Sequence, residues 1–568
     1  MCAILGGNNT KWNYQYGIES MRHRGPDGIQ ITQMNEITFA FARLAIIDLS
    51  SNGMQPMFST DRDVCIAFNG EVYKHDKLRK ELEKKYVFHS KTDTEVLLYA
   101  YIEYGDKFID KIDGMFAIAV YDKRYEKIKL FRDRAGIKPL YYYVQGCDFG
   151  FASELKGLTN MICTTELRVD RTALYDFLTY TYIPEPKTIY KNAYKLEPAH
   201  YLVYDLKEKR IEKKASYWKF RINANEKGKM DIGEAKYELR KRIRESVKSQ
   251  MIADVPVGTL LSGGVDSGVV TFESHRINEY IQTFSMGFKE KNYDEIQYAR
   301  QLVRLWNLNN HEGRFGKETF DALYPNVRKW FDEPYADVSA FPTYGILQLA
   351  KENDVTVLLT GDGGDEVFGG YDVVGALYEK RGINIKEISD LYENSLRRRI
   401  RNKSFWDGFF LDDVAFLTYR RYWALREQKK KYAEYLRLPK DYDDYWFVRK
   451  HYHKELPPMT RVQIVDFHTF LPFILSKVDR TGMALSLEVR VPLLDRKVVE
   501  YSFSLPQEVR CPNRLKKGLL KQAYPEIPYN IRYRTKQGFG MPGQYISVAG
   551  RPCESILTQQ WGELFNKI

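Results

Sequence analysis

The sequence predicts two halves of different fold class: an α+β half of stacked antiparallel sheets with helices, then an α/β half built on a parallel sheet. In the first two hundred residues, short apolar runs alternate with Gly, Asp and Asn turns, a pattern typical of strands. A polar stretch rich in Lys and Asn follows, with the composition of a linker. Beyond it, helical patterns alternate with short apolar strands, which favours a parallel sheet.

Five apolar runs predict strands in the first half: ITFAFARLAIIDL, VCIAFNGEVY, FAIAVYD, KIKLFRD and FGFASEL. A single helical segment, 93–104, is expected to interrupt them, and the sheets should close near HYLVYDL. Stacked sheets with some helix are the expected result.

In the second half, GEAKYELRKRIRESVKSQM predicts a helix, and VGTLLSGGVDSGVVTFESH predicts a strand, a turn and the start of a helix. VTVLLTGDGGDE predicts another strand that ends in a Gly-rich turn. Ligands bind at the carboxyl ends of parallel strands, so these turns are candidate binding loops. From about residue 383, aromatic and charged residues at helical spacing indicate a mostly helical elaboration.

Composition excludes several classes of protein. The chain has 568 residues, 66.7 kDa and 44% apolar residues, enough for two substantial domains. Its six cysteines form no CxxC pair, which argues against a zinc knuckle or a disulfide framework. The net charge of +12 comes from basic residues interleaved with acidic ones, so we expect no nucleic-acid partner. With no long apolar run and no signal peptide at the start, we expect no membrane association and a cytoplasmic location.

Cys2 is the first candidate catalytic residue. Removal of the initiator Met would leave Cys2 at the N-terminus, where its α-amino group, with a pKa of about 8, could act as base for its own thiol. A lone Cys at this position could equally be a chance residue ahead of a buried strand. The motifs that follow it favour the catalytic interpretation.

Those motifs supply partners for each polar group of glutamine. Arg43 suits the α-carboxylate, and Asp93 with Glu71 suits the α-ammonium group. Asn69 and the Gly70 N–H suit the oxyanion of a tetrahedral intermediate. RHRGPDG, ARLAIIDL, FNGEVY, KTDTE and FASELKGL together resemble the glutaminase domain of class II glutamine amidotransferases, which are N-terminal nucleophile hydrolases. The resemblance implies that residues 22–28 belong to a loop that closes over bound glutamine; a structural turn is the alternative for its Pro-Asp-Gly part.

LLSGGVDS, at 260–267, predicts a loop whose backbone N–H groups and hydroxyls converge on an anion. It lacks the Gly-Lys-Ser/Thr ending of a Walker A motif. It resembles instead the pyrophosphate-binding loop of enzymes that split ATP into AMP and pyrophosphate.

Further motifs continue this resemblance in order: TFSMGF, YDEIQYAR, DEPYADVSAFPTY, TGDGGDEVFGGYD, DRTGMALSLEVRVPLLD and YRTKQGFGMP. Over nearly the whole chain the sequence is similar to asparagine synthetases. The resemblance implies a glutaminase domain at 2–205, a linker at 206–231 and an ATP-pyrophosphatase domain at 232–568. It assigns Mg²⁺ to Asp266 and Asp365, a cation that carboxylates suit when phosphate oxygens share it. It assigns ATP to Leu260, Ser262, Gly263, Gly264, Asp266, Ser267, Met286, Thr360 and Gly361.

The implied chemistry activates a carboxylate as an acyl-adenylate, which ammonia then attacks. Lys536 stands where the family keeps a lysine at the α-phosphate, and Lys517 aligns with a second one in an uncertain register. Asp362, assigned to the catalytic set, stands where asparagine synthetases usually carry Glu, a position associated with forming the adenylate. The family also implies an internal passage for ammonia, and the last 26 residues match nothing in it.

The leading hypothesis is therefore a glutamine-dependent asparagine synthetase that uses glutamine, ATP and aspartate, and that could form a homodimer. Asp362 favours one alternative, in which the same chemistry amidates a uronic acid of a surface polysaccharide or a peptide carboxylate. A catalytically idle binding protein is a second alternative, and it predicts no glutaminase activity and no exchange of pyrophosphate into ATP.

Overall fold

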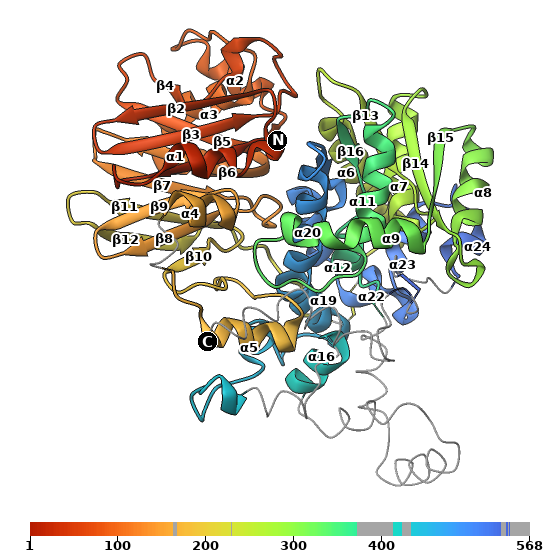
Figure 1. The fold of residues 1–568 in the computed structure, drawn as a ribbon. Helices are drawn as coiled ribbons and strands as arrows, with labels where there is room; N and C mark the ends of the chain where they lie inside the picture. The colour runs from red at the N-terminus through yellow and green to blue at the C-terminus, as the bar shows by residue number, and fades with distance from the viewer. Residues whose placement is uncertain are drawn as a thin grey trace.

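The computed structural model describes residues 1–162, 167–225, 227–228, 230–371, 413–422, 433–534, 541–542 and 545. Two sheets with their helices form one half of the molecule, and a third sheet with most of the remaining helices forms the other (Figure 1). This is the predicted order of an α+β half followed by an α/β half.

Two six-stranded antiparallel sheets make up the first half. The first has the order β10 (Ala193–Lys195), β8 (Tyr141–Gln145), β9 (Asp148–Ala152), β1 (Ala3–Gly7), β3 (Ile37–Arg43) and β2 (Gly28–Met34). The second has the order β12 (Arg210–Ser216), β11 (His200–Asp205), β7 (Lys127–Arg132), β6 (Asp113–Asp122), β5 (Val64–Tyr73) and β4 (Met57–Phe58).

Strand alternation explains how the sheets stack. On β1, Ile4 packs between the sheets, whereas its neighbours Ala3 and Leu5 pack outward against helices. The helices against the first sheet are α1 (Tyr14–Glu19), α4 (Leu155–Met161) and α5 (Arg171–Tyr180). The second sheet is covered by α2 (Asp76–Leu82) and α3 (Asp93–Tyr104). The result is a sandwich of four layers, with helices outside and sheets inside.

Two expectations for this half are wrong in part. The helix at 93–104 is present as α3, but it is one of five α-helices among the described residues of this half and not a single one. The range 206–231, expected to be a linker, contains β12, which pairs with β11 as an edge strand of the second sheet. Ordered sheet therefore extends to Ser216.

The second half has a five-stranded parallel sheet. Its order is β15 (Asn309–Phe315), β14 (Gln282–Phe288), β13 (Val257–Leu260), β16 (Val357–Leu359) and β17 (Glu488–Arg490). The chain runs outward from β13 through β14 to β15 and then returns to β16 on the other side of β13. The gap between the ends of β13 and β16 is thus a topological switch point, where ligands of such sheets bind.

Helices cover both faces of this sheet. Val357 and Leu359 face α6 (Ile232–Gln250) and α7 (Val265–Ile277), and Leu358 faces α11 (Ala340–Lys351) and α20 (Leu471–Met483). α6 confirms the predicted helix after the polar stretch. Among the described helices, none is long and apolar enough to cross a membrane.

Most of the other described helices of this half pack around the sheet. Those after residue 383 form the predicted helical elaboration, which includes a helix at 413–422 that lies apart from the sheet, beside α5 (Figure 1). The other described helices of this half are α8 (Ile296–Trp306), α9 (Lys317–Leu323), α10 (Val327–Trp330), α12 (Gly364–Phe368), α16 (Asp413–Tyr422), α18 (Trp446–His451), α19 (Pro458–Thr469), α21 (Arg496–Ser504), α22 (Gln507–Arg510), α23 (Gly518–Ala523) and α24 (Tyr529–Arg532).

Candidate functional site

Cys2 lies directly before β1, and its side chain is buried between the two antiparallel sheets. Its backbone N–H donates to Asn69 Oδ1 on β5 at 3.0 Å. Asn69 is fully buried. It lies two and four positions after Ala67 and Cys65 on β5, so its side chain is on the same face of the strand as theirs, between the two sheets. Period-two alternation on both strands therefore brings Cys2 and Asn69 together.

Asn69 and Gly70 have the features of an oxyanion site. Asn69 Nδ2 is buried and makes no hydrogen bond within the part of the chain that the structure describes. Such an unmet donor costs free energy unless a ligand takes it. Gly70 has φ = +152°, and a Cβ there would lie 2.0 Å from the Met115 carbonyl oxygen. Glycine is thus required at the residue next to Asn69.

A cavity with about 380 Å³ of empty space opens beside Cys2. Arg43 lines one part, where its guanidinium donates to the carbonyl oxygens of Asp48 and Ser50. The other residues that line it are Met1, Cys2, Phe41, Leu44, Ile46, Ile47, Gly53, Gln55, Phe68, Gly70, Glu71, Thr92, Asp93 and Thr94. All the predicted glutamine-binding residues except Asn69 line this cavity, and Asn69 touches Cys2 directly.

Two buried carboxylates lie at the cavity. Asp93 Oδ2 accepts a hydrogen bond from the Val72 N–H at 2.8 Å, and burial raises the pKa of Asp93. Burial and the nearby Asp93 raise the pKa of Glu71 well above its ordinary value. Arg490, from β17 of the second half, lies 3.5 Å from Glu71. An ammonium group placed between the two carboxylates would favour their charged forms.

The Met1 amino group also reaches the second half of the molecule. Its nitrogen lies 3.0 Å from Glu488 Oε2, and both groups are fully buried. Burial raises the pKa of the Cys2 thiol, so at neutral pH this thiol needs a base before it can act as a nucleophile. While Met1 is attached, the nitrogen of Cys2 is an amide and is not basic.

The RHRGPDG segment is placed differently from the loop that resemblance implied. Residues 22–24 form a short 3₁₀ helix, and none of residues 22–28 lines the cavity beside Cys2. Arg24 is fully buried and pairs with Asp479 of α20. This part of the segment is therefore a contact between the two halves.

The second site lies at the switch point of the parallel sheet. The loop after β13 carries Ser262, whose hydroxyl is 2.9 Å from the Ser267 hydroxyl at the start of α7. Gly263 has φ = +73°, which favours glycine. In the loop after β16, a Cβ on Gly361 would lie 2.5 Å from the Ser267 N, so the two loops pack as closely as backbone allows.

The two carboxylates predicted to hold Mg²⁺ lie together. Lys517 Nζ forms ion pairs with both Asp266 and Asp365. Asp266 Oδ1 is buried and has no hydrogen-bond partner among the described residues. Two carboxylates fit a cation that completes its coordination with phosphate oxygens and water. Within the described ranges, no cluster of three or more His, Cys, Asp or Glu side chains could hold a metal by itself.

A large open cleft, with about 1600 Å³ of empty space, joins these loops to α11 and α20. Asp362 lies in it and accepts a hydrogen bond from the Thr360 hydroxyl at 2.8 Å. Lys477 lines it further along, 3.0 Å from Ser339 Oγ and 3.6 Å from Asp337. Of the predicted residues, Leu260, Ser262, Gly264, Asp266, Ser267, Met286, Thr360, Gly361, Asp362 and Asp365 line this cleft. Gly263 shapes the loop without lining the cleft, and Lys536 lies outside the described residues.

Sequence reasoning missed three contributors. The alignment of Lys517 with a family lysine was uncertain, and only the fold shows that it contacts both Asp266 and Asp365. Lys477 was not singled out, although it lies only two positions before Asp479, where the DRTGMALSLEVRVPLLD motif begins. Glu488 lies within that motif, but its contact with Met1 joins opposite ends of the chain.

Comparisons with known proteins show the family. The asparagine synthase family model matches residues 238–561, and the glutamine amidotransferase domain model matches residues 1–218. Glutamine-hydrolysing asparagine synthetase 1 of Bacillus subtilis is 33% identical over 544 residues, 92% of this chain and 82% of that protein. A putative asparagine synthetase 2 of Methanocaldococcus jannaschii is 37% identical over 377 residues, 62% of this chain and 71% of that protein. Asparagine synthetase 3 of B. subtilis is 27% identical over 572 residues, 95% of this chain and 87% of that protein.

Proposed function

The chain belongs to the asparagine synthase family and carries a glutamine amidotransferase domain, and we propose that it converts aspartate into asparagine with nitrogen from glutamine. The family membership makes it an ATP-dependent ligase that hydrolyses glutamine. The proposal includes aspartate as the acceptor, the roles of single residues, a Mg²⁺ ion and a cytoplasmic location. It also places the end of the glutaminase domain after Ser216, where β12 ends, and the start of the ATP-pyrophosphatase domain near Ile232, where α6 begins.

In the first half, Cys2 acts as the nucleophile after Met1 is removed. Its thiolate attacks the side-chain amide carbon of glutamine, the free α-amino group having taken the thiol proton. Asn69 Nδ2, which is buried without a partner among the described residues, donates to the oxyanion together with the Gly70 N–H. Ammonia leaves, and water hydrolyses the thioester to glutamate.

Arg43, Glu71 and Asp93 select glutamine. The Arg43 guanidinium lines the cavity and pairs with the α-carboxylate, and the buried carboxylates of Glu71 and Asp93 hold the α-ammonium group. A neutral analogue would lack the charges that pair with these three groups, which gives the site its specificity.

In the second half, the acceptor carboxylate attacks the α-phosphorus of ATP, and pyrophosphate departs with the electrons of the broken P–O bond. Ser262, Ser267 and the loop N–H groups bind the pyrophosphate end. Asp266 and Asp365 would hold Mg²⁺, whose chemistry is to neutralise charge on the phosphate oxygens. Lys517, now between these carboxylates, would then pair with phosphate. Ammonia displaces AMP from the adenylate.

One observation supports the joining of these activities in one reaction. Glu71 lines the cavity beside Cys2 and contacts Arg490 of β17, a strand of the sheet that carries the second site. The glutamine site is therefore built at the boundary with the ligase half. Ammonia released there starts next to that half, not in solvent.

Asp362 favours a second candidate acceptor. It is one methylene shorter than the Glu that asparagine synthetases usually carry, and the Thr360 hydroxyl holds one of its oxygens at 2.8 Å. The cleft around it is open and large. Both features suit a bulkier carboxylate, such as a uronic acid or a peptide side chain.

The test uses glutamine labelled with ¹⁵N in the side-chain amide, Mg-ATP and aspartate. We expect ¹⁵N-asparagine, AMP, pyrophosphate and glutamate by mass spectrometry, in equal amounts. If glutamate forms but neither AMP nor asparagine does, aspartate is the wrong acceptor, and uronic acids and acidic peptides are tested in its place. If no glutamate forms from the chain with Met1 removed, the proposed role of Cys2 is refuted.

A further inference from the structure

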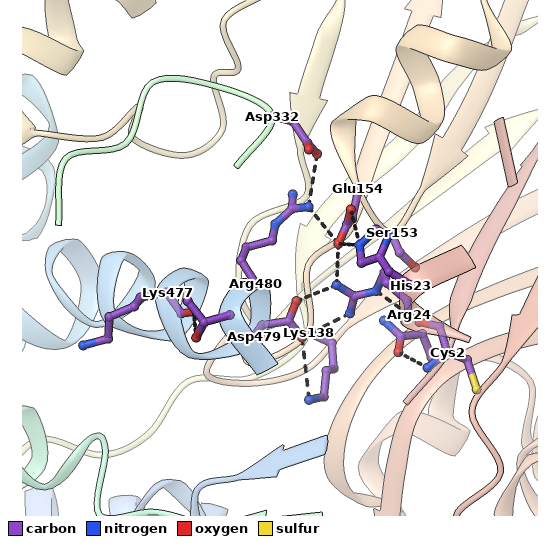
Figure 2. A network of polar contacts seen from close by, with 12 residues as sticks. Cys2, His23, Arg24, Lys138, Ser153, Glu154, Asp332, Lys477, Asp479 and Arg480 are labelled. Carbon is purple, nitrogen blue, oxygen red and sulfur yellow. Dashed lines mark hydrogen bonds and ion pairs between the residues drawn. The ribbon is translucent and has the colours of Figure 1, made fainter. Parts of the chain in front are cut away.

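A network of buried charges joins the first half to α20 (Figure 2). Arg24 is fully buried and forms three charge-assisted hydrogen bonds, to Glu154 at 2.8 Å and to the two oxygens of Asp479 at 2.7 and 3.1 Å. Arg480, the next residue of α20, contacts Glu154 at 2.9 Å and Asp332 at 3.1 Å. We call these five residues the interface network.

The interface network is costly to bury, so its position calls for an explanation. Burial alone would raise the pKa of Glu154, but Arg480, Lys156, His23 and Arg24 hold it well below its ordinary value. Buried ion pairs are often less stabilising than apolar residues of the same size, whereas they hold a geometry that is lost when one partner is removed. The better explanation is that the interface network fixes the position of α20 relative to the first half, in addition to any contribution to stability.

At one end, the interface network touches the nucleophile. Arg24 Nε donates to the carbonyl oxygen of Cys2 at 3.3 Å. The guanidinium is planar and rigid, so a shift of the Cys2 backbone changes the direction of its bonds to Asp479. Asp479 is thus linked to Cys2 through one side chain, across 477 positions of sequence.

At the other end, α20 reaches the ATP cleft. Lys477 precedes Asp479 by two residues, a rotation of about 200° around a helix with 3.6 residues per turn. The two side chains therefore leave α20 on opposite sides, as Figure 2 shows. Lys477 contacts Ser339 at 3.0 Å and lines the cleft together with Val478 and Ile474.

We propose that Asp479 is a positioning residue that couples the glutamine cavity to the acceptor end of the ATP cleft through α20. Covalent occupancy of Cys2 moves Arg24, Arg24 draws Asp479, and the helix carries this displacement to Lys477. Ammonia release is thereby matched to an acceptor site that is ready to use it. The inference rests on the proposed function and adds a mechanism that coordinates the rates of its two reactions, glutamine hydrolysis and amidation of the acceptor.

The first test is Asp479→Asn, which keeps the shape of the side chain and removes its charge. Coupling between linked sites commonly amounts to about 5–150-fold, so we expect the ratio of glutamate to AMP to rise at least about fivefold above the wild-type ratio. AMP formation with added ammonium should stay within about twofold of wild type, because the ATP loops are untouched. A purely structural defect would lower both activities and leave the ratio unchanged.

Arg496→Gln is the matched control. Arg496 Nε lies 2.8 Å from Asp113 Oδ1, so this pair also joins the two halves, but it does not involve α20. We expect its glutamate-to-AMP ratio to equal that of wild type. An equal rise in both variants would overturn the assignment to Asp479, as would an unchanged ratio in Asp479→Asn. If Asp479→Asn does not fold, Asp479→Glu, which keeps the charge but lengthens the side chain, decides by the same ratio.

A second readout does not depend on the acceptor. Cys2 is alkylated with 6-diazo-5-oxo-L-norleucine, and amide hydrogen exchange is followed in residues 471–483. We expect slower exchange in labelled wild type than in unlabelled wild type, and no such change in Asp479→Asn. Equal exchange before and after labelling of wild type would refute the coupling even if aspartate proves to be the wrong acceptor. Absence of AMP with aspartate, together with slower exchange, would refute only the acceptor.

Discussion

Asn69→Asp is the sharpest test of the glutaminase chemistry, because it exchanges one donor for an acceptor with almost no change of shape. Asn69 is fully buried, its Oδ1 accepts from the Cys2 nitrogen at 3.0 Å, and its Nδ2 has no partner in the described part of the chain. The variant keeps the hydrogen bond to Cys2 and removes the donor that faces the oxyanion. Folding should therefore change much less than catalysis.

The expected size follows from the loss of one oxyanion donor, which costs about 2.7–4 kcal/mol, or about 10²–10³ in kcat. A carboxylate at position 69 would also repel the developing negative charge, so the loss should be at least about 100-fold. The ATP loops lie in the other half, and ammonium-dependent AMP formation should stay within about twofold of wild type.

The assay compares glutamate formation with ammonium-dependent AMP formation in the same preparation, and Gln55→Glu is the matched control. Gln55 is a buried amide in the same cavity, but its Nε2 already donates to Thr94 Oγ1 at 3.0 Å and is not available to an oxyanion. We expect its glutaminase loss to be smaller than that of Asn69→Asp. Equal losses in the two variants, or a loss below about tenfold for Asn69→Asp, would refute the oxyanion role.

Three other outcomes follow from the structure. Cys2→Ala should abolish glutamine-dependent turnover and spare turnover with added ammonium, and loss of both in a folded variant would contradict independent sites. Gly70→Ala should destabilise the first half by about 1–3 kcal/mol, measured by thermal melting, because its Cβ would lie 2.0 Å from the Met115 carbonyl at φ = +152°. Glu154→Gln should make the free energy of unfolding, measured in urea, fall less steeply as the pH is lowered into the acid range. Despite its burial, Arg480 and other cations hold the pKa of Glu154 well below its ordinary value. Its stabilisation is therefore present above pH 4.5 and is lost as the pH falls below that value. An equally steep fall of the free energy of unfolding at acid pH in wild type and Glu154→Gln would contradict this.

The chemistry of glutamine and the resemblance to asparagine synthetases predicted the residues of the two sites, and local rules of strand geometry explain why many of them lie together. Alternation along a strand turns Asn69 toward Cys2, and the ends of β13 and β16 place two Gly-rich loops at the switch point. Ser262 and Asp362, 100 residues apart in sequence, therefore meet in one cleft. To apply these rules, it is enough to know which residues form each strand.

The errors come from elements whose local signal is weak. β12 was taken for a linker because it is an edge strand, mostly exposed and rich in Lys, which is how edges avoid pairing with other chains. α1 and α2 have six and seven residues, too few for a helical period to stand out from neighbouring strands. The resemblance assigned residues 22–28 to a loop over bound glutamine, and it gave no sign that Arg24 pairs with Asp479, because the sequence alone does not show which partner a buried charge contacts.

The boundary between the halves explains why the glutamine site cannot be understood from the first half alone. Among the described residues that remain after removal of Met1, two ion pairs cross this boundary at or next to the site: Arg24 with Asp479, and Glu71 with Arg490. Removing one partner of a buried pair costs about 3–5 kcal/mol, so an isolated first half would expose or leave unpaired the charges that shape its own cavity. The full arrangement of the cavity beside Cys2 therefore depends on contacts with the ligase half.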